Sequence, residues 1–340
     1  MRLLPTQEQR AMAQAVRDAL TKECTPETLR ESWDGTPQHK LQQTLAGLGL
    51  FGLTVSEEFG GLGLDERDAI GVFEETGRAA VPGPIAESFA ACYALQAAGS
   101  ALGQQWLPRI ASGEAVASLG LGDAPLVESA DRADLLILQH GDELHAVEGR
   151  DVQVEREQSV DGNRRLFTVS WEATAQTRLV SAAARILGGT RDRLLLATSA
   201  QLLGLARKLL DMAVAHVNIR EQFGGPLGSF QAVQHRLADV AVGADFTAPV
   251  VARAACSLAA DAPSAARDVA MAKVFASEAA EHAAYSALQL HGAIGYTREH
   301  DLHIYSLRAW TLALAHGDAR THRARVAADL LSDQIAPRYP

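Results

Sequence analysis

Aromatic residues, cysteines and basic residues are scarce in this chain. Phe, Trp and Tyr make up 5% of its 340 residues, and the three cysteines lie far apart, at Cys24, Cys92 and Cys256. An odd number of widely spaced cysteines predicts reduced thiols rather than a disulfide framework or a cysteine-ligated metal. The 41 acidic residues outnumber the 31 basic ones, which gives a formal net charge of −10. This balance argues against nucleic acid as a partner, because phosphate backbones are bound by clustered Lys and Arg.

Long apolar runs are also missing. No segment offers the roughly 20 apolar residues that a membrane-spanning helix needs. The first residues, MRLLPTQEQRAMAQAV, lack the apolar core of a signal peptide. We therefore expect a cytoplasmic protein with no membrane partner. Its length and its 47% hydrophobic content are enough to bury a sizeable core in more than one packed unit.

The hydrophobic pattern predicts short helices, then strands, then long helices. The expected helices of the first third span 6–22, 37–49, 64–79, 84–98 and 103–111. Runs rich in β-formers predict a small antiparallel sheet or barrel, with strands at 115–119, 135–138, 144–147, 152–154 and 165–171. Four long helices on short connections predict an antiparallel bundle, with helices at 191–222, 229–258, 264–290 and 301–333. The expected fold is mainly α with a small β-domain: an N-terminal helical domain (1–113), a reduced middle β-domain (114–187) and a C-terminal four-helix bundle (188–340).

One junction between two long helices combines a basic and an aromatic residue. Apolar residues recur at helical spacing over 195–217, and the Gly-Gly-Pro at 224–226 ends the helix. Arg220 at this junction has two interpretations. Its charge can complement the negative end of the helix dipole. Alternatively, its planar fork of donors can bind a phosphate or pyrophosphate, with Phe223 as a stacking surface. Residue chemistry alone favours the first.

Three segments resemble one family, the acyl-CoA dehydrogenases. Arg220-Glu-Gln-Phe-Gly followed by Phe230-Gln-Ala-Val-Gln is similar to the family signature R-x-x-F-G and F-Q-x-x-Q. Gln289-Leu-His-Gly-Ala-Ile-Gly-Tyr is similar to Q-x-h-G-G-x-G, and residues 47–63 resemble part of the N-terminal helical domain. The family's fold is helix, sheet, helix. Its two C-terminal segments reach across a dimer interface to flavin adenine dinucleotide (FAD) that is bound mainly by the neighbouring subunit.

The resemblance therefore implies FAD as the cofactor and a set of residues that contact it. Carried over residue by residue, the implied contacts are Arg220, Gln222, Phe223, Phe230, Gln231, Gln289, Leu290, His291, Gly292 and Ala293. Ala293 replaces a usual glycine, so a backbone contact there requires a φ that is not positive.

Two parts of the family's catalytic apparatus are missing from the sequence. The T-E-P-x-x-G-S-D segment that holds the flavin ring has no counterpart, because residues 118–125 read Ser-Leu-Gly-Leu-Gly-Asp-Ala-Pro. The family's reaction, α,β-dehydrogenation of an acyl-CoA thioester, needs a desolvated carboxylate to take the α-proton. The usual Glu position is His316, followed by Gly317 and Asp318, and the second location known for the base aligns with Leu194. An imidazole differs from a carboxylate in reach and shape, so no residue is assigned as the catalytic base.

A chain that keeps the cofactor contacts but lacks the base predicts that a second subunit supplies the catalytic residues. The chain resembles the short, base-less subunit of α2β2 acyl-CoA dehydrogenases of actinobacterial steroid side-chain degradation. This implies a paralogous catalytic partner subunit, an acyl-CoA substrate such as a steroid side-chain CoA ester, and an acceptor of the electron-transfer-flavoprotein type. Two alternatives stay open: a homomeric acyl-CoA dehydrogenase that uses His316 or another base, and a non-catalytic scaffold subunit.

A group of histidines near the third segment superficially offers metal ligands. His300 and His303 share a helix face, and His291 and Glu299 lie near them in sequence. No third ligand follows at a fixed spacing. We expect surface and interhelix hydrogen bonds here and no metal.

Overall fold

The computed structural model describes residues 3–122 and 125–332, so Asp123, Ala124 and the expected helix end at 333 lie outside the described residues. The chain forms two compact units. The N-terminal unit contains residues 7–72 and 81–197; the C-terminal unit contains the residues before 7, residues 73–80 and the chain from 198. The mainly α fold with a small β region is confirmed. The boundaries of the three expected domains stay a prediction.

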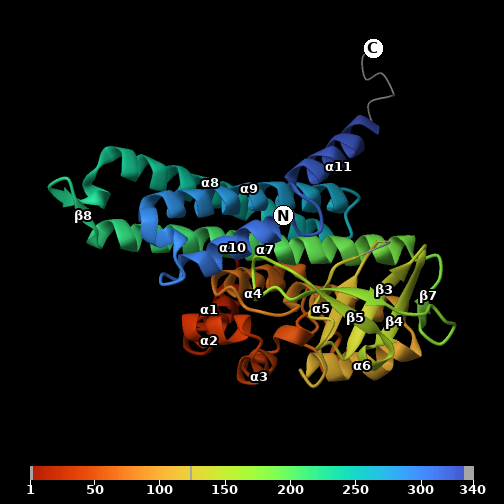
Figure 1. Ribbon diagram of the computed structural model, residues 1–340. Coiled ribbons are helices and arrows are strands. Elements are labelled where there is room, and N and C mark those ends of the chain that lie inside the picture. Colours follow the sequence, from red (N-terminus) through yellow and green to blue (C-terminus); the bar gives the residue numbers. More distant parts are fainter. Residues whose placement is uncertain (1–2, 123–124, 333–340) are drawn as a thin grey trace, which may run out of the picture. The chain divides into compact units, whose positions relative to one another are not determined.

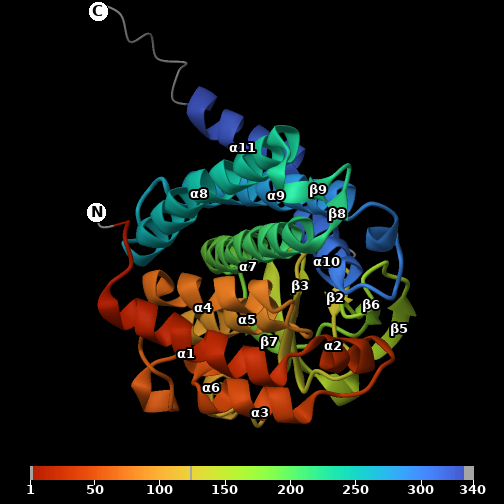
Figure 2. The same cartoon turned by 90° about the vertical axis from the view of Figure 1, so that its left-hand side faces the viewer.

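The N-terminal unit begins with short helices. They are α1 (Gln7–Glu23), α2 (Pro26–Trp33), α3 (His39–Gly47), the first part of α4 (Glu66–Arg78), α5 (Ile85–Ala98) and α6 (Ala101–Ala111). Figure 2 shows α1 and α3 side by side, and the two helices contact each other. Helix α2 was not predicted, although its start carries two helix signals. The Thr25 side chain accepts a hydrogen bond from the Thr28 amide at 3.3 Å, and Pro26 occupies the first turn.

Two small sheets complete this unit. Their strands are β1 (Ala117–Gly120), β2 (Val127–Glu128), β3 (Leu135–His140), β4 (Glu143–Glu148), β5 (Gln153–Glu157), β6 (Leu166–Ser170) and β7 (Arg178–Val180). One sheet has the order β1-β3-β4-β7 and the other β2-β6-β5. The expectation of one antiparallel sheet or barrel was wrong in this respect, because β1 pairs parallel with β3. Strand β2 lies between them in sequence and joins the other sheet, so β1 and β3 cannot form a hairpin.

The C-terminal unit is a bundle of long helices. They are most of α7 (Ala184–Ile219), α8 (Gln231–Ala259), α9 (Ala265–His291), α10 (Leu302–Leu314) and α11 (Ala319–Ser332). Helix α9 contacts α8, α10 and α11, and Figure 1 shows α8 and α9 side by side. Its buried face is made largely of alanines, which let helices approach closely: Ala270, Ala272, Ala276, Ala280, Ala284 and Ala287. No helix within residues 3–122 and 125–332 has the length and hydropathy to cross a membrane.

The first long helix ends earlier than expected. Helix α7 stops at Ile219 rather than at 222, and a hairpin follows, formed by β8 (Glu221–Gln222) and β9 (Gly225–Pro226). Its two turn residues, Phe223 and Gly224, have φ values of 55° and 87°. Positive φ at both central residues reverses the chain with the twist that a two-residue hairpin needs, and it cannot continue a helix.

Two glycines allow α4 and α7 to touch within the C-terminal unit. A Cβ atom on Gly204 would lie 1.9 Å from the carbonyl oxygen of Glu74, and one on Gly77 would lie 2.0 Å from that of Gln201. Two ion pairs join the same helices, Arg207 with Glu74 and Arg78 with Asp211. The backbones therefore approach so closely that neither position accepts a side chain.

Gly204→Ala should destabilise the C-terminal unit, because its methyl group must push the two backbones apart. Overpacking of this kind costs about 1–3 kcal/mol. Gly243→Ala in α8 is the matched control, since no atom lies within 4 Å of its added Cβ; helix propensity alone should stabilise it by about 0.5–1 kcal/mol. Thermal unfolding of the isolated chain followed by circular dichroism tests both changes. An unchanged or raised Tm for Gly204→Ala contradicts the close crossing.

A buried lysine holds the turn between α10 and α11. Lys273 of α9 is 0% exposed. Its ammonium donates to three oxygens, Ser277 Oγ at 3.0 Å, Ala313 O at 2.8 Å and Gly317 O at 3.2 Å. These bonds compensate for the loss of water around the charge. His322 of α11, which is 1% exposed, donates from Nε2 to the carbonyl oxygen of His316 at 3.1 Å. Two buried nitrogenous side chains thus fix this turn.

Acid should weaken the C-terminal unit through His322. Burial, helped by the nearby Lys273 and Arg325 charges, lowers the pKa of His322 to about 4, against about 6.5 in an unfolded chain. Between these two pKa values the unfolded chain binds more protons than the folded chain. The free energy of unfolding therefore falls as the pH falls from about 6.5 towards 4, by about 1–2 kcal/mol at pH 5. His322→Gln, which keeps a donor, should flatten the loss of Tm between pH 7 and pH 5. His282→Gln, an exposed control on α9, should keep the slope; equal slopes in the two variants would argue against the assignment.

Candidate cofactor-binding site

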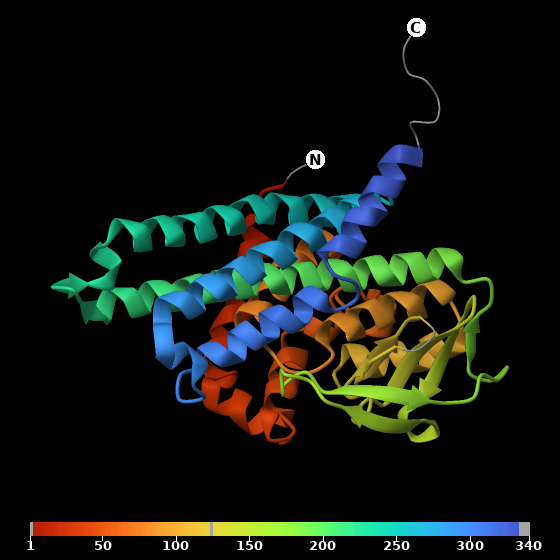
Figure 3. The ribbon, with the colours of Figure 1, turned by 45° about the horizontal axis from the view of Figure 1, so that its top comes forward.

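The hairpin after α7 presents two exposed aromatic rings. Phe223 at its turn is 88% exposed, and Phe230, just before α8, is 37% exposed. The rings lie edge to face with their centroids 6.2 Å apart. Figure 3 shows this hairpin at the end where α7 and α8 join. Transfer of apolar rings out of water is favourable, so this exposed tip is suited to binding another molecule.

Arg220 lies at the base of the hairpin with a fixed backbone and an exposed side chain. Its amide donates to the carbonyl oxygen of His216 at 3.0 Å, and its carbonyl accepts from the Leu227 amide at 2.8 Å. Its guanidinium forms no hydrogen bond or ion pair with any residue in the described part of the chain. Gln222, which precedes Phe223, and Gln231, which follows Phe230, are also exposed. The expected contacts on this segment therefore face solvent.

The second expected segment spans the end of α9. Gln289 is exposed, Leu290 is half-buried and His291, the last helical residue, is buried. Gly292 ends the helix with a φ of 64° and a ψ of −140°, a conformation that favours glycine. Ala293 does not have a positive φ, so the condition for a backbone contact at this position is met. Both residues are exposed.

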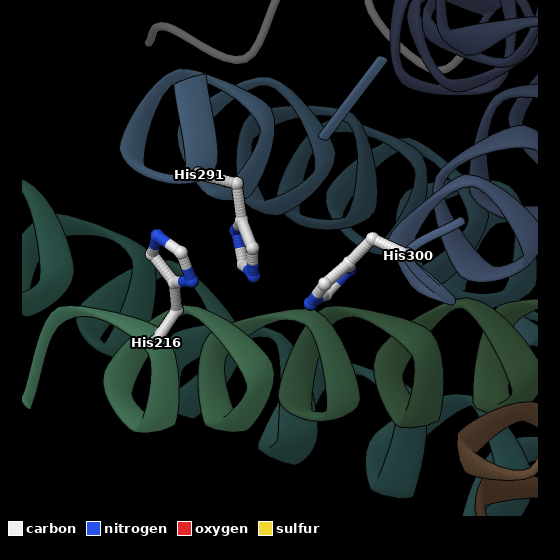
Figure 4. Close-up of side chains that lie close together, drawn as sticks. All are labelled: His216, His291 and His300. Atoms are coloured by element: carbon white, nitrogen blue, oxygen red, sulfur yellow. The ribbon is translucent and has the colours of Figure 1, made fainter. Parts of the chain in front are cut away.

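Histidine rings bring the two segments together. His216, in the last turn of α7, stacks on His291 with a centroid distance of 4.2 Å and an interplanar angle of 26°. His300, which precedes α10, lies with its ring centroid 4.7 Å from that of His291. Figure 4 shows the three rings converging from three segments of the chain. Residues 289–293 therefore lie beside the helical turn that leads into Arg220.

Only part of this histidine group was predicted from the sequence. His300 was paired with His303, but Nδ1 of His303 bonds the carbonyl oxygen of His300 at 2.8 Å and its ring is not part of the group. His216 was not predicted, because it is far away in sequence. Burial lowers the pKa of His291 to about 4, and burial together with His300 and Arg220 lowers the pKa of His216. His291 is thus neutral at pH 7.

The position of the family's base lies in the turn that Lys273 holds. His316 is half-buried with a φ of 59°. Asp318 accepts hydrogen bonds from the amide and the hydroxyl of Thr321 at 2.8 and 2.6 Å, and these bonds lower the pKa of its carboxyl group. The carboxylate is therefore ionised and caps α11. At the alternative position, Leu194 is 3% exposed within α7 and offers no titratable group.

Family models match both ends of the chain. The model described as "Acyl-CoA dehydrogenase, N-terminal domain" matches residues 6–114. The model described as "Acyl-CoA dehydrogenase, C-terminal domain" matches residues 190–331. The second match contains the hairpin, the loop after α9 and the turn at His316.

Curated relatives and solved structures match nearly the whole chain. Acyl-CoA dehydrogenase IpdE2 of Mycolicibacterium smegmatis is 31% identical over 96% of this chain and 99% of its own length. IpdE2 of Mycobacterium tuberculosis is 32% identical over 94% of both chains. A solved variant of the Tcur3481–Tcur3483 steroid ACAD superimposes with a TM-score of 0.86 at 25% identity, covering 97% of this chain and 99% of its own. The resemblance found in the sequence is confirmed, and the chain belongs to the acyl-CoA dehydrogenase family.

Proposed function

We propose that this chain is the base-less subunit of a flavin-dependent acyl-CoA dehydrogenase, which completes the FAD site of a paralogous catalytic subunit in an α2β2 assembly. One observation carries the proposal: Arg220 is exposed, and its guanidinium has no hydrogen-bond or ion-pair partner in the described part of the chain. It lies in the same segment as the exposed rings of Phe223 and Phe230, and near the exposed turn at Gly292. FAD is the cofactor of this family. Its flavin, when bound, accepts the hydride that leaves the β-carbon of the acyl group.

The residues present fit a dinucleotide. A guanidinium fork suits the paired oxygens of a pyrophosphate, and Phe223 and Phe230 supply apolar surface for the organic part. Gly292 has no Cβ, and both it and Ala293 are exposed residues, so amide groups of this turn can approach phosphate or ribose. In this proposal the chain binds and orients the cofactor, while proton transfer belongs to the partner subunit.

The turn at His316 supports the assignment of proton transfer to a partner. Its carboxylate, Asp318, is committed to capping α11, and its backbone is fixed by Lys273 and His322. A base must be free to reach the α-carbon of the substrate. These contacts stabilise the turn and leave no acid there for catalysis.

The name of one match supports the substrate class and the heteromeric assembly. The solved structure named above is called a steroid ACAD and joins two protein names, Tcur3481 and Tcur3483. On this basis we propose a steroid side-chain CoA ester as the substrate. We propose an electron-transfer-flavoprotein-type protein as the acceptor, because the family reaction leaves an electron pair on the flavin.

Arg220→Ala should lower the flavin content of the assembled enzyme. Loss of a hydrogen-bonded charge costs about 1.5–3 kcal/mol, on the order of 10- to 100-fold in FAD affinity. The variant is co-expressed with its proposed partner, a paralogous acyl-CoA dehydrogenase chain that carries the base, and released flavin is measured per assembly. Arg220→Lys should restore part of the affinity, because it restores charge without the fork.

Arg150→Ala is the matched control, since Arg150 is an exposed arginine in the N-terminal unit. Flavin content unaffected by Arg220→Ala would favour the scaffold interpretation. A lone wild-type chain that purifies with full flavin and oxidises an acyl-CoA would establish the homomer instead.

His316→Asn separates the homomer from the proposed assembly. Asparagine tolerates the positive φ of this position and has no imidazole to accept a proton. If the partner supplies the base, kcat of the assembly with an acyl-CoA substrate should stay within about twofold of wild type. A base at His316 predicts a loss on the order of 100-fold or more, measured as reduction of an artificial electron acceptor.

A further inference from the structure

Three histidines gather where α7, α9 and the start of α10 meet. His216, His291 and His300 each offer one ring nitrogen, and these nitrogens all lie within 4.8 Å of one another. The residues come from segments that are far apart in sequence, so the fold brings them together (Figure 4). Imidazole is the commonest side-chain ligand of transition metals in proteins.

The ring of His291 has a buried nitrogen that is available as a ligand. Its Nδ1 lies 2.7 Å from the carbonyl oxygen of Ala287. A carbonyl only accepts, so Nδ1 carries the proton and Nε2 carries a lone pair. That Nε2 is buried and has no hydrogen-bond partner within residues 3–122 and 125–332. A backbone carbonyl that fixes one nitrogen while the other is left for an ion is the usual arrangement around metal-bound histidines.

The other two rings are partly exposed and can move. No hydrogen bond to the side chain of His216 exists in the described part of the chain. Nδ1 of His300 accepts the Leu302 amide at 3.1 Å. Coordination through Nε2 of His300 would place the proton on Nδ1 and break this neutral bond. A metal–imidazole bond is stronger than the single hydrogen bond that it replaces.

We propose that His216, His291 and His300 bind a divalent transition-metal ion of the zinc class. Three imidazoles without a carboxylate or thiolate favour Zn²⁺, Co²⁺, Ni²⁺ or Cu²⁺ over Mg²⁺ and Ca²⁺, which require oxygen ligands. A water molecule completes a fourth position, because His216 and His300 face solvent in part.

The rings need only small movements to bind an ion. Nitrogens around a tetrahedral zinc lie about 3.3 Å apart, since each Zn–N bond is about 2.0–2.1 Å. The widest separation must therefore shrink by about 1.5 Å. Small rotations of the His216 and His300 side chains can supply this, because both rings are partly exposed. The charge of Arg220 opposes a cation nearby, but this side chain is exposed and its repulsion is screened by solvent.

Metal titration of the isolated, tag-free chain tests the site without flavin. Zn²⁺ is titrated in competition with a chromogenic chelator, and Co²⁺ is titrated to observe the visible absorption of a tetrahedral ion. We expect one ion per chain. Loss of an outer-shell partner typically lowers metal affinity 10- to 100-fold, and loss of a direct ligand should lower it at least as much. We therefore expect His216→Ala, His291→Ala and His300→Ala each to lower zinc affinity by at least this factor.

His282→Ala, which removes an exposed histidine of α9 outside the cluster, should bind zinc as the wild type does. His216→Ala and His300→Ala change partly exposed rings, so they keep the test valid if His291→Ala fails to fold. The proposal is overturned if the wild type binds no zinc at micromolar concentrations, which is the result expected if a water molecule occupies the space between the three rings. It is also overturned if the cluster variants bind as tightly as His282→Ala. Because no flavin is present, neither result depends on the proposed function.

Discussion

The stack of His216 on His291 is the contact on which the candidate site depends. It holds the last turn of α7 against the end of α9, and the two expected cofactor segments begin at these helix ends. An aromatic pair contributes only about 0.5–1.5 kcal/mol beyond its buried area. The stack therefore supplements the packing of the helices, in which the alanine-rich face of α9 allows α8 and α10 to pack closely. Helix packing thus positions the exposed residues of the site.

The same helix α9 determines what the turn after α10 can do. Lys273 projects from α9 into the carbonyls of residues 313 and 317, and its bonds would be costly to break in a buried setting. In a dehydrogenase with its own base, this turn must present a carboxylate to substrate. Here His316 occupies that position and Asp318 caps the next helix. In this chain the turn serves as a structural element, which supports the proposal that the chemistry belongs to a partner subunit.

The sequence predicted the fold well where the signal was local and periodic. The long helices α8 and α9 appear within a few residues of their expected ranges, because their apolar spacing repeats over many turns. The hairpin at Phe223 was missed, since Arg-Glu-Gln-Phe is compatible with a helix and only the positive φ at Phe223 reveals the reversal. Strands β2 and β7 are too short for a periodic signal, and the parallel pairing of β1 with β3 depends on contacts that no local pattern contains.

The site shows the same limit. Motif resemblance found Arg220, Phe223 and the loop after α9, but it could not find His216, because nothing local links that residue to His291. The helical spacing of His300 and His303 suggested a pair that the fold does not use. Spatial clusters of single residues from separate helices are visible only in three dimensions.

The geometry also divides the atoms of His291 between two roles. Resemblance places this residue among the cofactor contacts, yet Nδ1 of its ring is bonded to Ala287 and Nε2 is buried. Neither ring nitrogen can reach a cofactor on the exposed face. A contact of this segment with a dinucleotide must therefore come from its exposed residues, Gln289, Gly292 and Ala293. The ring is left to the histidine cluster, so a metal ion and a cofactor phosphate would use different atoms of one loop and need not compete.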